Sequence, residues 1–189
     1  MKKIFLLISI ALLLPACGGS DGAKTGDSDQ IFYHQYQTAE FTIDVPDDWE
    51  TLTAFSSEYP DNIRIAFRDN IKDGDYIANV TVFKEDNLKN LLNGDISQNY
   101  LSDHNDTLIS YKLISQEEVT LSVLGSSSQS IINTFEGKND TRDNLITYIQ
   151  TYLAEGETAW VVTASYYAPT EDEFTVERMQ TMIKSFTVN

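Results

Sequence analysis

Apolar side chains alternate with polar ones in one short segment after another, and this period of two residues limits the fold more than any other feature. In residues 41–45, Phe41, Ile43 and Val45 alternate with Thr42 and Asp44. This spacing is typical of a β-strand with one buried face. Six later segments also carry strand patterns: residues 63–67, 77–83, 111–121, 130–135, 145–153 and 159–167. The chain is therefore expected to fold around a sheet.

Two segments change to the three- and four-residue spacing of an amphipathic helix. The first covers residues 88–100. The second begins at residues 170–173, where Thr-Glu-Asp-Glu has the form of a capping box, and its apolar side chains extend to Phe186. We expect both apolar stripes to pack against the sheet. The element order β-β-β-β-α-β-β-β-β-α predicts an α+β domain.

The N-terminus has the order of an export signal. Two lysines precede an apolar run over residues 4–14, which is too short to span a bilayer. Residues 14–17 read Leu-Pro-Ala-Cys, and Cys17 is the only cysteine. The alternatives are a plain secretory signal with an incidental cysteine, or a buried structural thiol.

This tetrapeptide resembles the bacterial lipobox. The resemblance implies cleavage before Cys17, a lipid on its thiol and a tether to the membrane outside the cytoplasm. We therefore divide the chain into a signal peptide (residues 1–16), a lipidated flexible tether (17–30) and one domain (31–189). By the same resemblance, Gly18 after the cysteine favours the outer membrane in a diderm host. A monoderm host leaves only the outer face of the cell membrane.

The charge balance is strongly acidic. The chain has 29 Asp and Glu residues against 13 Lys and Arg residues. Nucleic acids and anionic lipid head groups are poor partners for such a surface, because their binding depends on clustered cations.

No catalytic motif is present. The two histidines, His34 and His104, lie in polar surroundings of the sequence and are expected to be solvated loop residues. Nucleophilic catalysis needs a base beside the nucleophile, and the chain has no Gly-x-Ser-x-Gly elbow, zinc ligand pair, phosphate loop or dinucleotide fingerprint. We expect a protein that is not an enzyme and has no cofactor.

Calcium is the one ion that the sequence leaves open. Asp69, Asp73 and Asp75 supply three carboxylates within seven residues, and hard cations bind carboxylate oxygens. The segment departs from an EF-hand loop, because Ile71 and Val80 stand where ligands are required. Ordinary turn chemistry is the alternative interpretation.

Aromatic residues gather on the two strand segments 145–153 and 159–167. Tyrosine and tryptophan often anchor protein contacts, and core packing is the alternative role. The candidate partner-binding residues are Tyr148, Tyr152, Trp160, Tyr166 and Tyr167.

Three stretches of the domain resemble the PsbP-like family: Glu-Phe-Thr-Ile-Asp-Val-Pro at residues 40–46 with Trp49 soon after, Ile-Ala-Asn-Val-Thr-Val at 77–82, and Met-Ile-Lys-Ser-Phe at 182–186. The resemblance implies an antiparallel β-sheet sandwiched by helices, an α/β/α sandwich. It also implies action by protein binding. We therefore expect a lipid-anchored protein-binding or assembly module of the cell envelope. The alternatives are a small-ligand or cation-binding lipoprotein and a hydrolase without a visible motif.

Overall fold

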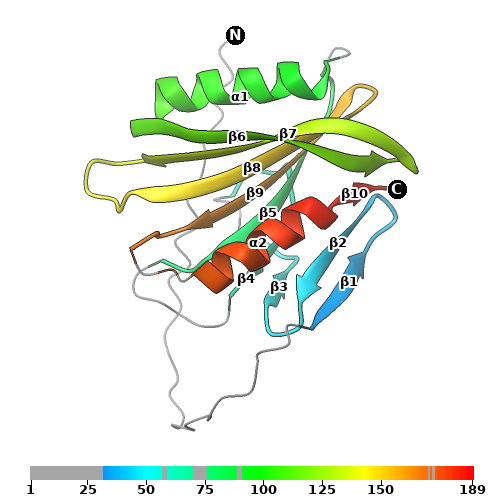
Figure 1. The fold of residues 1–189 in the computed structure, drawn as a ribbon, viewed down its shortest axis with the longest axis horizontal. Coiled ribbons are helices and arrows are strands. Elements are labelled where there is room, and N and C mark those ends of the chain that lie inside the picture. The colour runs from blue at the N-terminus through cyan, green and yellow to red at the C-terminus, as the bar shows by residue number, and fades with distance from the viewer. Residues whose placement is uncertain (1–31, 57–58, 70–75, 89–90, 170, 172) are drawn as a thin grey trace, which may run out of the picture.

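The structure is a computed structural model that describes residues 32–56, 59–69, 76–88, 91–169, 171 and 173–189. In this part of the chain, one curved sheet of ten strands carries a helix on each face (Figure 1). The strands are β1 (Tyr33–Gln37), β2 (Phe41–Pro46), β3 (Glu50–Leu52), β4 (Ile63–Arg68), β5 (Asn79–Glu85), β6 (Ile109–Val123), β7 (Ser126–Lys138), β8 (Ile146–Glu155), β9 (Thr158–Tyr166) and β10 (Thr187–Val188). The helices are α1 (Asn93–Thr107) and α2 (Glu173–Ser185).

The strand order in the sheet is β1-β2-β10-β6-β7-β8-β9-β5-β4-β3. The expectation of an antiparallel sheet sandwiched by helices is wrong. The protein is mostly β, and its sheet is mixed, because β10 lies antiparallel to β2 but parallel to β6. The parallel pair is possible because α2 connects β9 to β10 as a crossover. After α2 the chain enters β10 and runs beside β6 in the same direction as β6.

The expected strand positions are confirmed, with three additions. The seven predicted segments lie in β2, β4, β5, β6, β7, β8 and β9. The chain also forms β1, β3 and β10. Five strands therefore precede α1, where the predicted order had four, and a short strand follows α2, where it had none. The two-residue loop at Gly156 and Glu157 joins β8 to β9 in an antiparallel hairpin.

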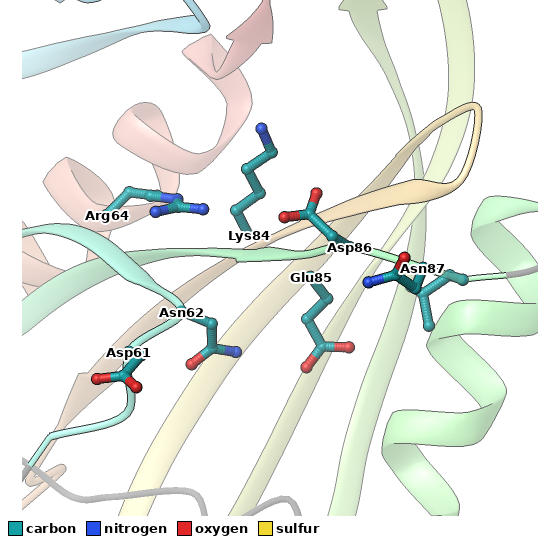
Figure 2. Close-up of a pocket in the computed structure, with 8 residues that line it drawn as sticks. Asp61, Asn62, Arg64, Lys84, Glu85, Asp86 and Asn87 are labelled. Atoms are coloured by element: carbon teal, nitrogen blue, oxygen red, sulfur yellow. The ribbon is translucent and has the colours of Figure 1, made fainter.

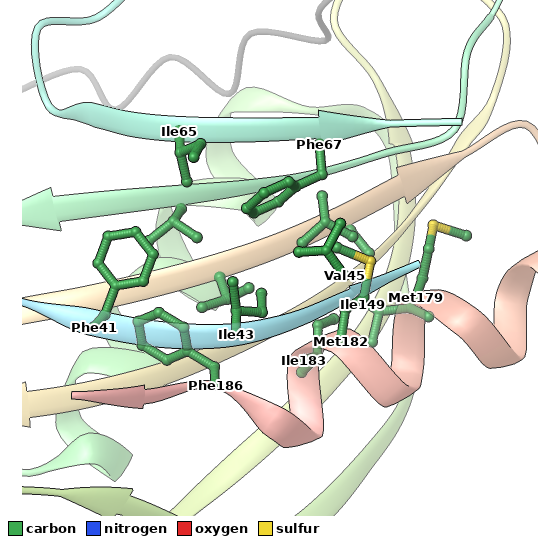
Figure 3. Close-up of a cluster of buried hydrophobic side chains, with 14 of the residues drawn as sticks. Phe41, Ile43, Val45, Ile65, Phe67, Ile149, Met179, Met182, Ile183 and Phe186 are labelled. Atoms are coloured by element: carbon green, nitrogen blue, oxygen red, sulfur yellow. The ribbon is translucent and has the colours of Figure 1, made fainter. Parts of the chain in front are cut away.

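The larger core lies between α2 and one face of the sheet (Figure 3). Met179, Met182 and Ile183 of α2 are fully buried against apolar side chains of β2, β4, β5, β8 and β9. Burial of a side chain of this size contributes about 1.5–3 kcal/mol. The predicted packing of the α2 stripe is therefore confirmed for these residues. Thr170 and Asp172 of the predicted capping box lie outside the described residues.

The opposite face of the sheet is covered by α1. Strand β8 shows the separation, because Ile149 and Leu153 join the core under α2 while Tyr148 and Tyr152 contact the side of α1. Alternate strand residues point to opposite faces, so the two helices lie on opposite sides of β8.

The predicted start of the first helix, at residue 88, is wrong. Leu88 precedes α1, and its N–H donates to the carbonyl oxygen of Glu157 at 2.8 Å. The helix instead extends to Thr107, and three of its five buried side chains are polar: Asn93, Ser97 and His104. Hydrophobic spacing does not detect such a face.

Neither helix of the described chain is both long and apolar enough to cross a bilayer.

Candidate functional site

Strand β6 has a long unpaired edge. Its fifteen residues pair with β7 along one side, but β10 covers the other side only at Ser122 and Val123. Within the described residues, no strand pairs with this side of β6 over residues 109–121. We call this stretch the β6 edge. Unpaired N–H and C=O groups on such an edge can hydrogen-bond to an extended chain.

The first half of the β6 edge is irregular and apolar. Register shifts mark one extra residue between Ile109 and Lys112 and another between Leu113 and Ser115. Ile109, Leu113 and Ile114 expose their side chains, and that of Ile114 is 49% exposed. Bulges of this kind hinder pairing with a second sheet.

The second half of the β6 edge, residues 115–121, is in regular register with β7. Glu117 and Glu118 lie here, and their side chains project to opposite faces. Lys184 of α2 reaches Glu117 at 3.1 Å between Nζ and Oε1. Within the described part of the chain, no cation pairs with Glu118, which is exposed. This half of the edge can accept a strand and carries a carboxylate beside it.

A charged depression lies where β4 begins and β5 ends (Figure 2). Arg64, Lys84 and Asp86 line it, and Figure 2 shows Lys84 and Glu85 leaving β5 in opposite directions. Its volume of about 510 Å³ would hold a small molecule. However, the lining is charged and open, whereas small-molecule sites are mostly apolar and enclosed.

Two charged groups of the depression already have partners within the chain. Lys84 Nζ lies 2.6 Å from Glu40 Oε1 and 5.2 Å from the centroid of the Trp160 ring. Thr158 Oγ1 donates to Asp86 Oδ1 at 3.1 Å. The described lining holds no hydroxyl, thiol or imidazole group that could act as a nucleophile or a neutral base.

A second cavity, beside the first turns of α1, has a volume of about 70 Å³. Glu85, Ile96 and Tyr100 are among its lining residues. Burial raises the pKa of Tyr100 well above its ordinary value, and the neighbouring Glu85 carboxylate raises it further. The cavity is too small for a drug-sized ligand.

His104 lies at the centre of a buried polar network, not in a solvated loop as expected. Its Nε2 is 3.0 Å from Oε1 of Gln150, which also accepts a hydrogen bond from the Tyr152 hydroxyl at 2.5 Å. The ring stacks on Phe135, with 4.7 Å between centroids, and among the described residues Nδ1 has no hydrogen-bond partner. The physical reason for the error is the extension of α1, which carries His104 over the sheet.

Burial lowers the pKa of His104 to about 4, because the charged ring would lose its hydration. At neutral pH the ring is therefore uncharged, and its side chain has no access to solvent. A group in this state holds the helix on the sheet and cannot exchange protons with a substrate.

His34 lies in β1, not in a loop. It is exposed, and its Nδ1 is 2.9 Å from Oδ1 of Asp47. The partners of the two imidazole rings are thus a carboxylate and an amide.

Three of the five aromatic candidates lie in the core: Tyr148, Tyr152 and Trp160 are buried. Tyr166 and Tyr167 are half-buried near the end of β9. The structure does not gather the five into one exposed patch, because alternate residues of β8 and β9 face opposite sides of the sheet.

Of the calcium candidates, Asp69 is buried directly after β4, and its N–H donates to the Ala78 carbonyl at 3.0 Å. Asp73 and Asp75 lie outside the described residues, so the calcium hypothesis stays a prediction. Within the described residues, no three Asp, Glu, His or Cys side chains are grouped to hold a metal ion. Cys17 also lies outside the described residues, and its lipidation stays a prediction.

Comparison with known proteins gives a likeness in structure only. No protein-family model matches the chain, and no curated protein matches it. The fold is similar to cyanobacterial PsbP (CyanoP) of Synechocystis sp. PCC 6803, with a TM-score of 0.57 and 15% identity, over 89% of this chain and 98% of that one. It is also similar to LpqN of Mycobacterium tuberculosis, a protein involved in cell envelope biogenesis, with a TM-score of 0.56 and 14% identity, over 85% and 92%.

At these identities the likeness shows the fold alone. The predicted resemblance to the PsbP-like fold is confirmed, although its sheet is mixed.

Proposed function

We propose that this chain is a lipid-anchored, non-catalytic module of the cell envelope that binds a partner protein. The observation that carries the proposal is the β6 edge, where the described chain leaves backbone groups unpaired beside exposed apolar side chains. An extended segment of a partner can add to such an edge through main-chain hydrogen bonds. The envelope role described for LpqN, which shares this fold, supports the proposed location.

The charges of the β6 edge favour a partner over a second copy of this chain. Glu117 and Glu118 both lie on the β6 edge, and the chain has a formal net charge of -16. Two copies would therefore repel each other. A partner segment with Lys or Arg opposite Glu118 would form a favourable cross-strand pair.

Crosslinking tests the proposed edge directly. A photoreactive amino acid replaces Glu118 in the full chain, expressed in its native cells. We expect one discrete adduct after illumination, because the partner segment would lie within reach of this side chain. The matched control carries the same group at Thr141, which is exposed in the loop between β7 and β8. Equal adducts from both positions, or none from Glu118, would show that the proposal is wrong.

The proposed lipid anchor at Cys17 is tested separately. Radiolabelled palmitate should be incorporated into the wild-type chain and not into Cys17→Ser, because the lipobox places the lipid on this thiol. Fractionation of the same cells should find the wild type in the membrane and the variant outside it. Equal labelling of the two proteins would contradict lipidation at Cys17. It would not bear on partner binding at the β6 edge.

A further inference from the structure

The turn between β6 and β7 contains a leucine in an unfavourable backbone conformation. Val123 pairs with Ser126, so Leu124 and Gly125 form a two-residue loop, with φ values of 50° and 72°. Positive φ at both central residues defines the type I′ hairpin turn, which strongly favours Asn, Asp or Gly. Gly125 suits this conformation. Leucine does not, because its Cβ is crowded and its side chain offers no local hydrogen bond.

Burial within the described chain does little to offset this strain. The Leu124 side chain is 60% exposed. Its backbone is nevertheless held firmly, because the Leu124 N–H donates to the Val188 carbonyl of β10 at 2.8 Å. The turn therefore presents an apolar side chain on a fixed support, and little conformational entropy would be lost when that side chain is bound.

No charged residue flanks Leu124 in the sequence, although the protein is acidic. Residues 119–135 contain no Asp, Glu, Lys or Arg, and Ser126, Ser127 and Ser128 follow the turn. An apolar side chain flanked by neutral polar residues fits the core of a protein interface, where charged residues are depleted.

A lipid surface fits this end of the molecule less well. Asn93, at the start of α1, hydrogen-bonds to both Ser128 Oγ and the Ala154 N–H, so the α1 start and the β8–β9 hairpin lie beside β7 here. These two elements bring the carboxylates of Asp95 and Glu157 to the same end, where anionic head groups would repel them.

We infer that Leu124 is the apolar anchor of the interface with the partner protein, and that it enters a pocket on that partner. The inference rests on the proposed function, because the β6 edge leads directly into this turn. A partner strand on residues 115–121 must end where β10 begins to pair with β6. The folded body of the partner would then lie against the turn.

Leu124→Asn separates a binding role from a structural one. Asn suits a type I′ turn, so the variant should unfold at a temperature a few degrees higher than the wild type. Loss of an anchor side chain typically weakens an interface at least tenfold. In native cells, the adduct from the crosslinker at Glu118 should therefore fall at least tenfold, and Leu124→Met should retain it.

Phe32→Asn is the matched control, because it removes an apolar side chain that is 64% exposed just before β1, away from the turn. Its adduct should equal that of the wild type. If Leu124→Asn keeps the adduct within twofold, the anchor role is wrong while the β6 edge stands. If the chain with the photoreactive group at Glu118 and no other substitution gives no adduct, the proposed function is wrong, and the anchor role of Leu124 is wrong with it.

Discussion

Lowering the pH from 7 to 4 should remove about 3 kcal/mol from the free energy of unfolding through His104 alone. Burial lowers the pKa of His104 to about 4 in the folded state, from about 6.5 in an unfolded chain. Between these two values the unfolded chain binds the extra proton and the folded chain does not. Stability due to this group is therefore fully present above pH 6.5 and falls as the pH approaches 4. Each unit of difference corresponds to about 1.4 kcal/mol.

Comparison with His104→Gln isolates this contribution from the acid titration of carboxylates. A glutamine amide can donate toward Gln150 Oε1 as Nε2 of the imidazole does, but it does not titrate. Urea unfolding at pH 7, 6, 5 and 4, followed by tryptophan fluorescence, should give a steeper loss for the wild type than for the variant. Parallel losses in the two proteins would contradict the assignment.

Phe186→Ala should destabilise the fold by about 4 kcal/mol, the usual range for removal of a buried aromatic ring being about 3–5 kcal/mol. Phe186 stands between α2 and β10 and is fully buried. Its ring centroid lies 5.5 Å from that of Phe41 and 6.1 Å from that of Trp160. Alanine would leave a cavity at the point where the chain turns from the helix into the last strand.

Urea denaturation at neutral pH measures this loss. Phe32→Ala is the control, since its side chain is exposed and its removal should change the unfolding free energy by less than about 0.5 kcal/mol. A loss below about 1 kcal/mol for Phe186→Ala would mean that the core around β10 is not packed as described.

The strands with regular alternation could be predicted from the sequence, because one buried face forces the period of two. The strands that the sequence did not reveal, β1, β3 and β10, have two to five residues. In β1 no side chain is buried, and β10 has only two residues, so no periodic pattern can be recognised. The mixed sheet follows from β10 and was therefore not predictable either.

The buried polar face of α1 could not be predicted for a different reason. Asn93, Ser97 and His104 are buried through hydrogen bonds, and the partners of these bonds lie on β7 and β8, 35 to 61 residues further along the chain. A polar side chain in the sequence gives no sign of a distant partner that will satisfy it. For this reason His104 was expected in solvent.

Only part of the candidate site could be predicted from the sequence. The strand at residues 111–121 was predicted, but its open edge depends on how far the last strand reaches, which is a property of tertiary structure. The turn offered a better signal, because Leu124-Gly125 stands between two predicted strands where Asn-Gly is usual.

The position of β2 between β1 and β10 bears on how the protein reaches its native state. In the proposed export across a membrane the chain would emerge N-terminus first, so β1 and β2 would be the first strands of the domain to leave the translocation channel. The apolar face of β2 packs against α2, and the edge of β2 opposite β1 pairs with β10. Helix α2 and strand β10 are the last two elements of the described chain. Contacts of such long sequence separation form late. If the chain is exported as proposed, Phe41, Ile43 and Val45 would therefore stay uncovered until translocation ends, and they would offer a binding segment to a chaperone on the far side of the membrane.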